Sequence, residues 1–187
     1  MKTNILKTLS LVVLALATTL FTACDLLDKV KDIDFDATLE ETINVNEENE
    51  GTNVNYTETI TLDATTDPDI DKYKSKIKGF TIKSVSYQVV SYDGPVASTF
   101  SGTLSFGDAS QTTPTVAATI TSLNLQQAYT TAEVFDLTIS QADVDKVANM
   151  LKDDKAVKLY LNGTFSATPV FANIRIILDV SVKAEAL

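Results

Sequence analysis

Two glutamates and one cysteine are the residues whose types and positions could support chemistry in this sequence of 187 residues. Histidine and tryptophan are absent, and Cys24 is the sole cysteine. Catalysis by Ser-His-Asp or Cys-His groups, zinc sites made of histidine or cysteine, haem ligation and internal disulfides are therefore excluded within the chain. The sequence predicts no cofactor and no metal site of these kinds. Carboxylate, hydroxyl, lysine and tyrosine chemistry remains.

Glu41 and Glu58 interrupt two neighbouring runs of alternating apolar and polar residues, because each falls at a position expected to face inward. A hairpin that places Val45 opposite Val54 would join the two runs, and in that register Glu41 lies opposite Glu58. Facing carboxylates repel, so one would be protonated or a cation would sit between them. The pair could then form a glycosidase-like dyad or a Ca²⁺ site. A register one step off, a strand end in solvent, or basic neighbours from another strand would each remove the pair.

The N-terminal residues have the features of a secretory signal peptide that ends at a cysteine. Lys2 and Lys7 precede an apolar run over residues 9–21, and two small residues follow before Cys24. A charged segment, a short apolar segment and small residues at the cleavage point are the three parts of such a signal. The apolar run is shorter than the ~20 residues of a membrane-spanning helix, which favours cleavage over an uncleaved anchor.

Residues 20–24, Leu-Phe-Thr-Ala-Cys, resemble a lipobox, although Phe21 stands where an aliphatic residue is usual. The resemblance implies that Cys24 is diacylglyceryl-modified and becomes the first residue after cleavage. A plain signal peptide with a chance cysteine is the alternative. An unpaired thiol in an exported protein otherwise lacks a purpose, which favours lipidation. Two or three acyl chains would anchor the protein stably, at ~0.8 kcal/mol per buried CH₂.

The charge of the chain and its leader predict its location and partners. Removal of residues 1–23 takes away two lysines and no acidic residue, so the net charge changes from −10 to −12. Nucleic acid is not an expected partner, because attraction to phosphates needs a basic surface. We expect the bacterial cell envelope, with a lipid anchor in the outer membrane and either the periplasmic or the surface face. Asp25 follows the cysteine directly, and in enterobacterial lipoproteins an aspartate at this position is associated with retention in the inner membrane. That sorting signal is not general, so Asp25 does not determine which membrane holds the anchor.

Alternating hydrophobicity predicts a mainly all-β domain at residues 34–187, after a signal peptide at 1–23 and a tether at 24–33. Apolar residues recur at every second position in the first run, from Phe35, and in the last two runs, from Val157 and from Val170. We expect the last two runs to form a hairpin near the centre of the sheets. A change of parity near Lys83 predicts a bulge. About eight strands with short turns predict a two-sheet antiparallel β-sandwich.

One or two short helices are expected among the strands. Asp67-Pro68 predicts a helix over residues 68–77, because aspartate can cap it and proline suits the first turn. Ser140 begins a capping-box pattern, and the apolar spacing after it predicts a helix to Leu151 whose apolar stripe packs on the sandwich. Residues 124–131 are interpreted as a polar linker.

With its lipobox, acidic threonine-rich body and alternating strands, the chain resembles small envelope lipoproteins of Bacteroidota. This resemblance implies no catalytic residues. The first hypothesis is a non-enzymatic module that binds a protein, glycan or apolar ligand; the alternative is a carboxylate-dyad enzyme that acts on polysaccharide through Glu41 and Glu58. A structural role in adhesion or surface coating is a third reading. Six tyrosines, scattered through a chain without tryptophan, predict no carbohydrate-stacking platform: Tyr56, Tyr73, Tyr87, Tyr92, Tyr129 and Tyr160.

Overall fold

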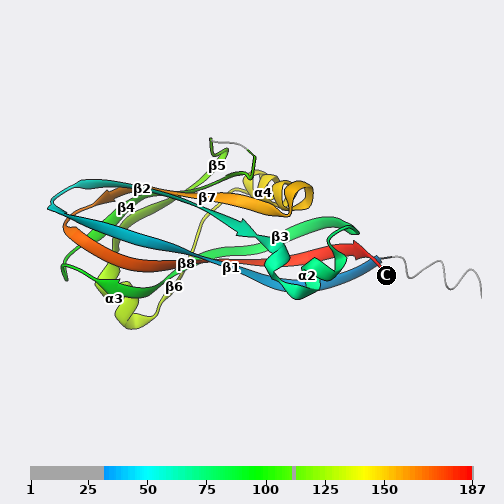
Figure 1. The fold of residues 1–187 in the computed structure, drawn as a ribbon, viewed down its shortest axis with the longest axis horizontal. Coiled ribbons are helices and arrows are strands. Elements are labelled where there is room, and N and C mark those ends of the chain that lie inside the picture. The colour runs from blue at the N-terminus through cyan, green and yellow to red at the C-terminus, as the bar shows by residue number, and fades with distance from the viewer. Residues whose placement is uncertain (1–31, 111–112, 187) are drawn as a thin grey trace, which may run out of the picture.

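Two antiparallel four-stranded sheets form the domain in the computed structural model, which describes residues 32–110 and 113–186 (Figure 1). In spatial order, the first sheet contains β1 (Asp32–Gly51), β8 (Thr168–Glu185), β3 (Ile77–Asp93) and β6 (Val134–Asp136). The second sheet contains β2 (Val54–Asp63), β7 (Ala156–Phe165), β4 (Thr99–Asp108) and β5 (Val116–Asn124). The predicted fold class, a mainly all-β sandwich of eight strands, is confirmed.

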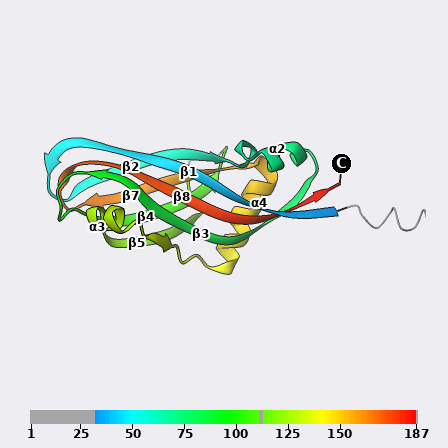
Figure 2. The same ribbon diagram turned by 90° about the horizontal axis from the view of Figure 1, so that it is seen from below.

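The strand order pairs the first half of the chain with the second half in reverse. Strand β1 pairs with β8, β2 with β7, β3 with β6 and β4 with β5, all antiparallel. Successive strands of each half lie in alternate sheets, as Figure 2 shows from below. One long antiparallel ribbon rolled into two sheets gives this order, which is the jelly-roll topology.

Both predicted hairpins are wrong. Strand β1 does not pair with β2, and β7 does not pair with β8, because each of these neighbours in sequence lies in the opposite sheet. The predicted central position of the last two strands is confirmed, since β7 lies between β2 and β4 and β8 lies between β1 and β3. Alternation specifies which side of a strand is buried, but it does not specify the partner strand.

The core lies between the sheets and consists of the apolar positions that the alternation indicates. Leu39, Ile43 and Val45 of β1 are buried, and every second residue of β8 from Val170 to Ala184 is buried. Each fully buried side chain of this size contributes about 1.5–3 kcal/mol relative to an exposed one. The predicted bulge near Lys83 is confirmed by a shift in the β3–β8 register between Ile82 and Ser84.

Four short helices connect strands in the part of the chain that the structure describes. They are the 3₁₀ helix η1 (Ala64–Thr66) and the α-helices α2 (Pro68–Tyr73), α3 (Leu125–Thr131) and α4 (Gln141–Asp154). The side chain of Ser140 caps α4 by accepting a bond from the Asp143 N–H, as its sequence predicts, and Val147 and Leu151 are buried against the sandwich. Helix α2 is shorter than predicted, since Lys74 is already its C-cap. The predicted linker over residues 124–131 is wrong, because it contains α3.

The two ends of the sandwich differ. At the end we call the α2 end, Asp32 pairs with Glu185 and the ring of Phe35 contacts that of Tyr73 in α2. Asp32 and Ile33 thus belong to β1, although the tether was predicted to continue to residue 33. The opposite end, the α3 end, carries α3 and the turns from β1 to β2, β3 to β4 and β7 to β8 (Figure 1). Within the described ranges, no helix has the length and hydropathy to span a membrane.

Candidate functional site

Cys24 and the predicted signal peptide lie outside the described residues. Lipidation at Cys24 therefore stays a prediction from the sequence. The described chain begins at the α2 end, where Asp32 starts β1.

The predicted pairing of Glu41 with Glu58 is wrong. Glu41 lies opposite Ile176 in the β1–β8 ladder, and Glu58 lies opposite Leu161 in the β2–β7 ladder. The two glutamates are thus on the edge strands of different sheets. Their predicted side is correct, because both are half-buried at the parity of the core residues.

Each of these carboxylates is bound by its own strand. Glu41 Oε1 accepts a hydrogen bond from the Thr42 N–H at 3.1 Å, and Glu58 Oε1 accepts one from the Thr59 N–H at 3.0 Å. The Tyr56 hydroxyl also donates to Glu58 Oε2, at 3.5 Å. In the part of the chain that the structure describes, no three acidic side chains gather in a way that could hold a metal ion. The dyad and Ca²⁺ hypotheses lose the geometry on which they depended.

The structure brings a different pair of carboxyls together, at the ends of β4 and α4. Partial burial and a hydrogen bond with Asp108 raise the pKa of Asp154 above its usual value. Hydrogen bonds from Ser110 lower the pKa of Asp108. The sequence gives no sign of this pair, since the residues are far apart in the chain. Asp154 is an exposed residue and Asp108 is half-buried, so the pair lies at the surface and keeps only part of its contact with water.

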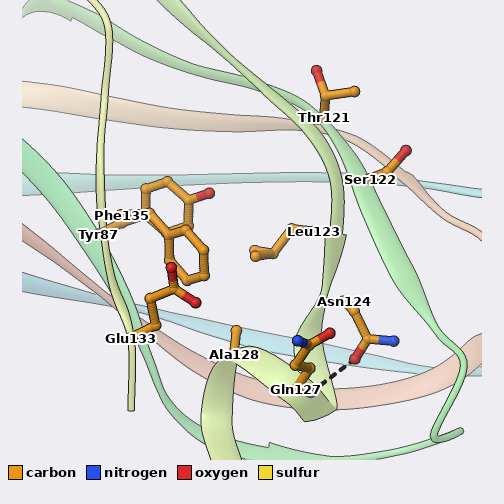
Figure 3. A pocket seen from close by; sticks show the side chains of 9 residues that line it. All are labelled: Tyr87, Thr121, Ser122, Leu123, Asn124, Gln127, Ala128, Glu133 and Phe135. Carbon is orange, nitrogen blue, oxygen red and sulfur yellow. Dashed lines mark hydrogen bonds between the residues drawn. The ribbon is translucent and has the colours of Figure 1, made fainter. Parts of the chain in front are cut away.

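A pocket of about 260 Å³ opens between α3, the end of β5, and the paired strands β3 and β6 (Figure 3). Strand β6 is short and lies at the edge of its sheet, so the two sheets are not closed here by a long strand pair. The pocket is lined by Tyr87, Thr121, Ser122, Leu123, Asn124, Gln127, Ala128, Glu133 and Phe135.

A bulge in β5 and the capped start of α3 shape one wall of the pocket. The β4–β5 register shifts between Phe100 and Gly102, and Ser122 in this bulge has a φ of 47°. The Ser122 N–H donates to Ser101 Oγ at 3.0 Å. Asn124 then caps α3, with its Oδ1 accepting from the Gln127 N–H at 2.8 Å (Figure 3). From this wall, Leu123 of β5 and Ala128 of α3 point toward the stacked rings, whereas Thr121 and Ser122 point away from them (Figure 3).

Two stacked aromatic rings form the opposite wall. Tyr87 and Phe135 are direct cross-strand partners in β3 and β6, and their ring centroids are 5.2 Å apart with 16° between the planes. Cross-strand aromatic pairs of this kind stabilise a sheet. Tyr87 has 6% of its surface exposed, and Leu123 and Ala128 are buried beside it. The base of the pocket is therefore apolar and well packed.

Glu133 is the single charged residue among those lining the pocket. Burial, and secondarily the charge of Glu133, raise the pKa of the Tyr87 hydroxyl above 10.0, so this group is neutral and protonated at pH 7. With one carboxylate and no lysine or arginine in its lining, the pocket disfavours anionic ligands. The net charge of −10 on the whole chain acts in the same direction.

The Tyr87 hydroxyl has no hydrogen-bond partner among the described residues, whereas the hydroxyls of Tyr56 and Tyr92 are bonded. The hydroxyl of Tyr92 donates to the Pro95 carbonyl at 2.8 Å. The Tyr87 oxygen points into the space of the pocket (Figure 3). No buried side-chain oxygen or nitrogen in the described ranges lacks a partner, so this oxygen must be reached through the pocket.

Exposed apolar side chains gather around α3 on the outside of the molecule. The large apolar residues with the highest exposure in the described chain are Val96, Tyr129, Val134 and Phe171. Tyr129 and Phe171 line a shallow hollow of about 320 Å³ together with Tyr92. Two of the six tyrosines that are scattered in the sequence, Tyr92 and Tyr129, thus come together at the α3 end. The sequence analysis missed this because the contacts join residues from β3, α3 and β8.

No protein-family model matches this sequence, and no characterised protein matches it by sequence. Three solved structures illustrate the similarity of fold. Desmodium yellow mottle tymovirus has a TM-score of 0.42 and 10% identity, covering 83% of this chain and 82% of that chain. The 60-mer BFDV capsid protein has a TM-score of 0.42 and 10% identity, covering 84% and 97%. Tobacco necrosis virus has a TM-score of 0.36 and 11% identity, covering 82% and 98%. Similarity at this level carries no argument about binding or assembly.

Proposed function

We propose that this chain is a lipid-anchored protein of the bacterial envelope whose β-sandwich is a non-enzymatic ligand-binding module. The leader that ends at Cys24 supports the anchor. The pocket beside α3 supports the binding role, because polar side chains of β5 and α3 and a stacked aromatic pair converge on one cavity.

The observation that carries the proposal is the distance between the pocket and the start of the domain. Ile176 of β8 pairs with Tyr87 of β3 on one side and with Glu41 of β1 on the other. Tyr87 and Glu41 therefore lie at the same level along the sheet. Glu41 is nine positions after Asp32, which corresponds to about 30 Å along a strand. Phe171 is opposite Asn46, which is further along β1 still. A tether before Asp32 would hold the α2 end near the bilayer and keep the pocket clear of it.

The chemistry of the chain supports a non-enzymatic role. The sequence has no histidine, and its sole cysteine is the expected attachment point of the lipid. The two glutamates considered for a dyad belong to different sheets and are bound to their own strands.

Intact mass and membrane fractionation of the expressed protein, compared with a Cys24→Ala variant, test the anchor. We expect the wild-type mass to correspond to a chain that begins at Cys24 and carries acyl chains, and we expect the protein in the membrane fraction. The variant should leave that fraction. An unmodified mass together with unchanged fractionation of Cys24→Ala would overturn the proposal.

A further inference from the structure

The Tyr87 hydroxyl is the starting point for assigning a ligand class to the pocket. Only 6% of the surface of Tyr87 is exposed, and its hydroxyl bonds to no described residue. The oxygen itself is open to the pocket, because no buried side-chain oxygen or nitrogen of the described residues lacks a partner. A hydroxyl that faces a pocket without a protein partner is placed to bond a ligand or a water that a ligand replaces.

The side chains around this hydroxyl are mostly uncharged and can both donate and accept hydrogen bonds. Gln127 supplies an amide from the first turn of α3, and Thr121 and Ser122 place hydroxyls at the outer rim, where they point away from the stacked rings (Figure 3). The Asn124 amide is already bonded, because its Oδ1 accepts from the Gln127 N–H and its Nδ2 donates to the Val96 carbonyl. Such groups match a ligand whose own polar groups also donate and accept, which is the property of a hydroxyl.

The other residues that line the pocket are apolar or aromatic and are mostly buried, so they present a small apolar surface. The Tyr87–Phe135 stack forms one wall, and Leu123 and Ala128 lie across from it (Figure 3). A sugar ring presents C–H groups on its faces and hydroxyls around its edge. It can therefore contact an apolar wall and the polar rim at the same time.

We infer that the pocket binds one ring of a neutral carbohydrate, an inference that rests on the proposed function of the domain as a binding module. Glu133 and the absence of lysine and arginine from the lining act against acidic sugars and phosphates. The volume of about 260 Å³ is slightly below the ~300–1,000 Å³ of most small-molecule pockets, so it suits a single ring. Further rings of a chain would extend from the opening into solvent.

Binding of simple sugars to the mature, full-length protein in a sugar-free detergent tests the inference. The probes are glucose, galactose and N-acetylglucosamine, with glucuronic acid as the acidic comparison, and saturation-transfer NMR reports their contacts. We expect at least one neutral sugar to bind and glucuronic acid to bind more weakly. Tyr87→Phe should weaken binding about tenfold, since it removes one hydrogen bond and keeps the stacked ring. Gln127→Ala should also weaken it.

Tyr73→Phe is the matched control, because it removes the same hydroxyl from a tyrosine of α2 at the opposite end. It should leave sugar binding unchanged. Failure of all three neutral sugars to bind, or equal affinity in wild type and Tyr87→Phe, would overturn the inference. Binding of tetramethylammonium in place of sugars, lost in Glu133→Gln, would instead identify a cation site. None of these results affects the fractionation of Cys24→Ala, so failure of the ligand class and failure of the anchor are distinguishable.

Discussion

Tyr87 and Phe135 lie face to face, with ring centroids 5.2 Å apart, although they are separated by α3 and two strands in the sequence. The contact exists because β6 returns to pair with β3 after α3 has crossed the open side of the sandwich. The same return leaves the pocket between the stacked rings and α3. The jelly-roll order of the strands therefore creates both the aromatic wall and the space in front of it.

Tyr87→Phe and Tyr92→Phe should differ in their effect on stability. The hydroxyl of Tyr87 bonds to no described residue, so its removal should change the free energy of unfolding by less than about 0.5 kcal/mol. Tyr92 donates to the Pro95 carbonyl at 2.8 Å, and the loss of this bond should cost about 1 kcal/mol. Urea denaturation of both variants measures the difference. Equal losses in the two variants would show that Tyr87 has a structural bond after all.

Glu41→Gln and Glu58→Gln should act independently. The two residues are on different sheets, and each accepts a bond from the backbone of its own strand. In a double-mutant cycle, their effects on the free energy of unfolding should add within about 0.5 kcal/mol. A coupling clearly above this value would mean that the carboxylates share a proton or a cation and that the dyad hypothesis must return.

Gly102→Ala should destabilise the sandwich. A Cβ on Gly102 would lie 2.6 Å from Gly163 Cα and even nearer to the Asn162 carbonyl oxygen, and both are backbone atoms of β7 that cannot move aside cheaply. Overpacking of this kind costs typically ~1–3 kcal/mol. Gly79→Ala is the control, because a Cβ at Gly79 would meet nothing within 4 Å. A loss of stability in Gly79→Ala as large as that in Gly102→Ala would rule out steric contact as the cause.

Stability should fall as the pH rises above about 10. Burial raises the pKa of Tyr87 above its usual 10.0, and burial raises that of Tyr56 as well. The folded protein thus keeps protons that the unfolded chain releases, so stability is complete below pH 10 and is lost as the pH rises through this range. Denaturation midpoints between about pH 8 and pH 11 measure the slope, which should be shallower in Tyr87→Phe. An unchanged slope in that variant would contradict the shift.

Much of the fold follows from local patterns in the sequence. Alternation identifies the buried side of β1 and β8, the parity change near Lys83 identifies a bulge, and Ser140 identifies the start of α4. Each of these features depends on residues a few positions apart. Local spacing is enough to predict them, because side-chain direction in strands and helices has a fixed period.

The pairing of the strands and the pocket could not be predicted in this way. The partner of Glu41 is Ile176, and many alternating runs in this chain are equally suitable partners by pattern alone. The rolled ribbon is selected by the packing of both sheets together, which is a property of the whole core. Helix α3 is a partial exception, since Asn124 is a good N-cap residue that was taken for part of a linker.

The central claim, an anchored module with its binding end away from the membrane, is tested most directly by fluorescence quenching on liposomes. Lys74→Cys and Val96→Cys place a single label at the α2 end and at the α3 end, where both side chains are largely exposed. The expected lipid on Cys24 leaves no other free thiol. With a quencher on the lipid headgroups, we expect strong quenching at position 74 and little at position 96. Equal quenching at both positions, or stronger quenching at position 96, would contradict the claim.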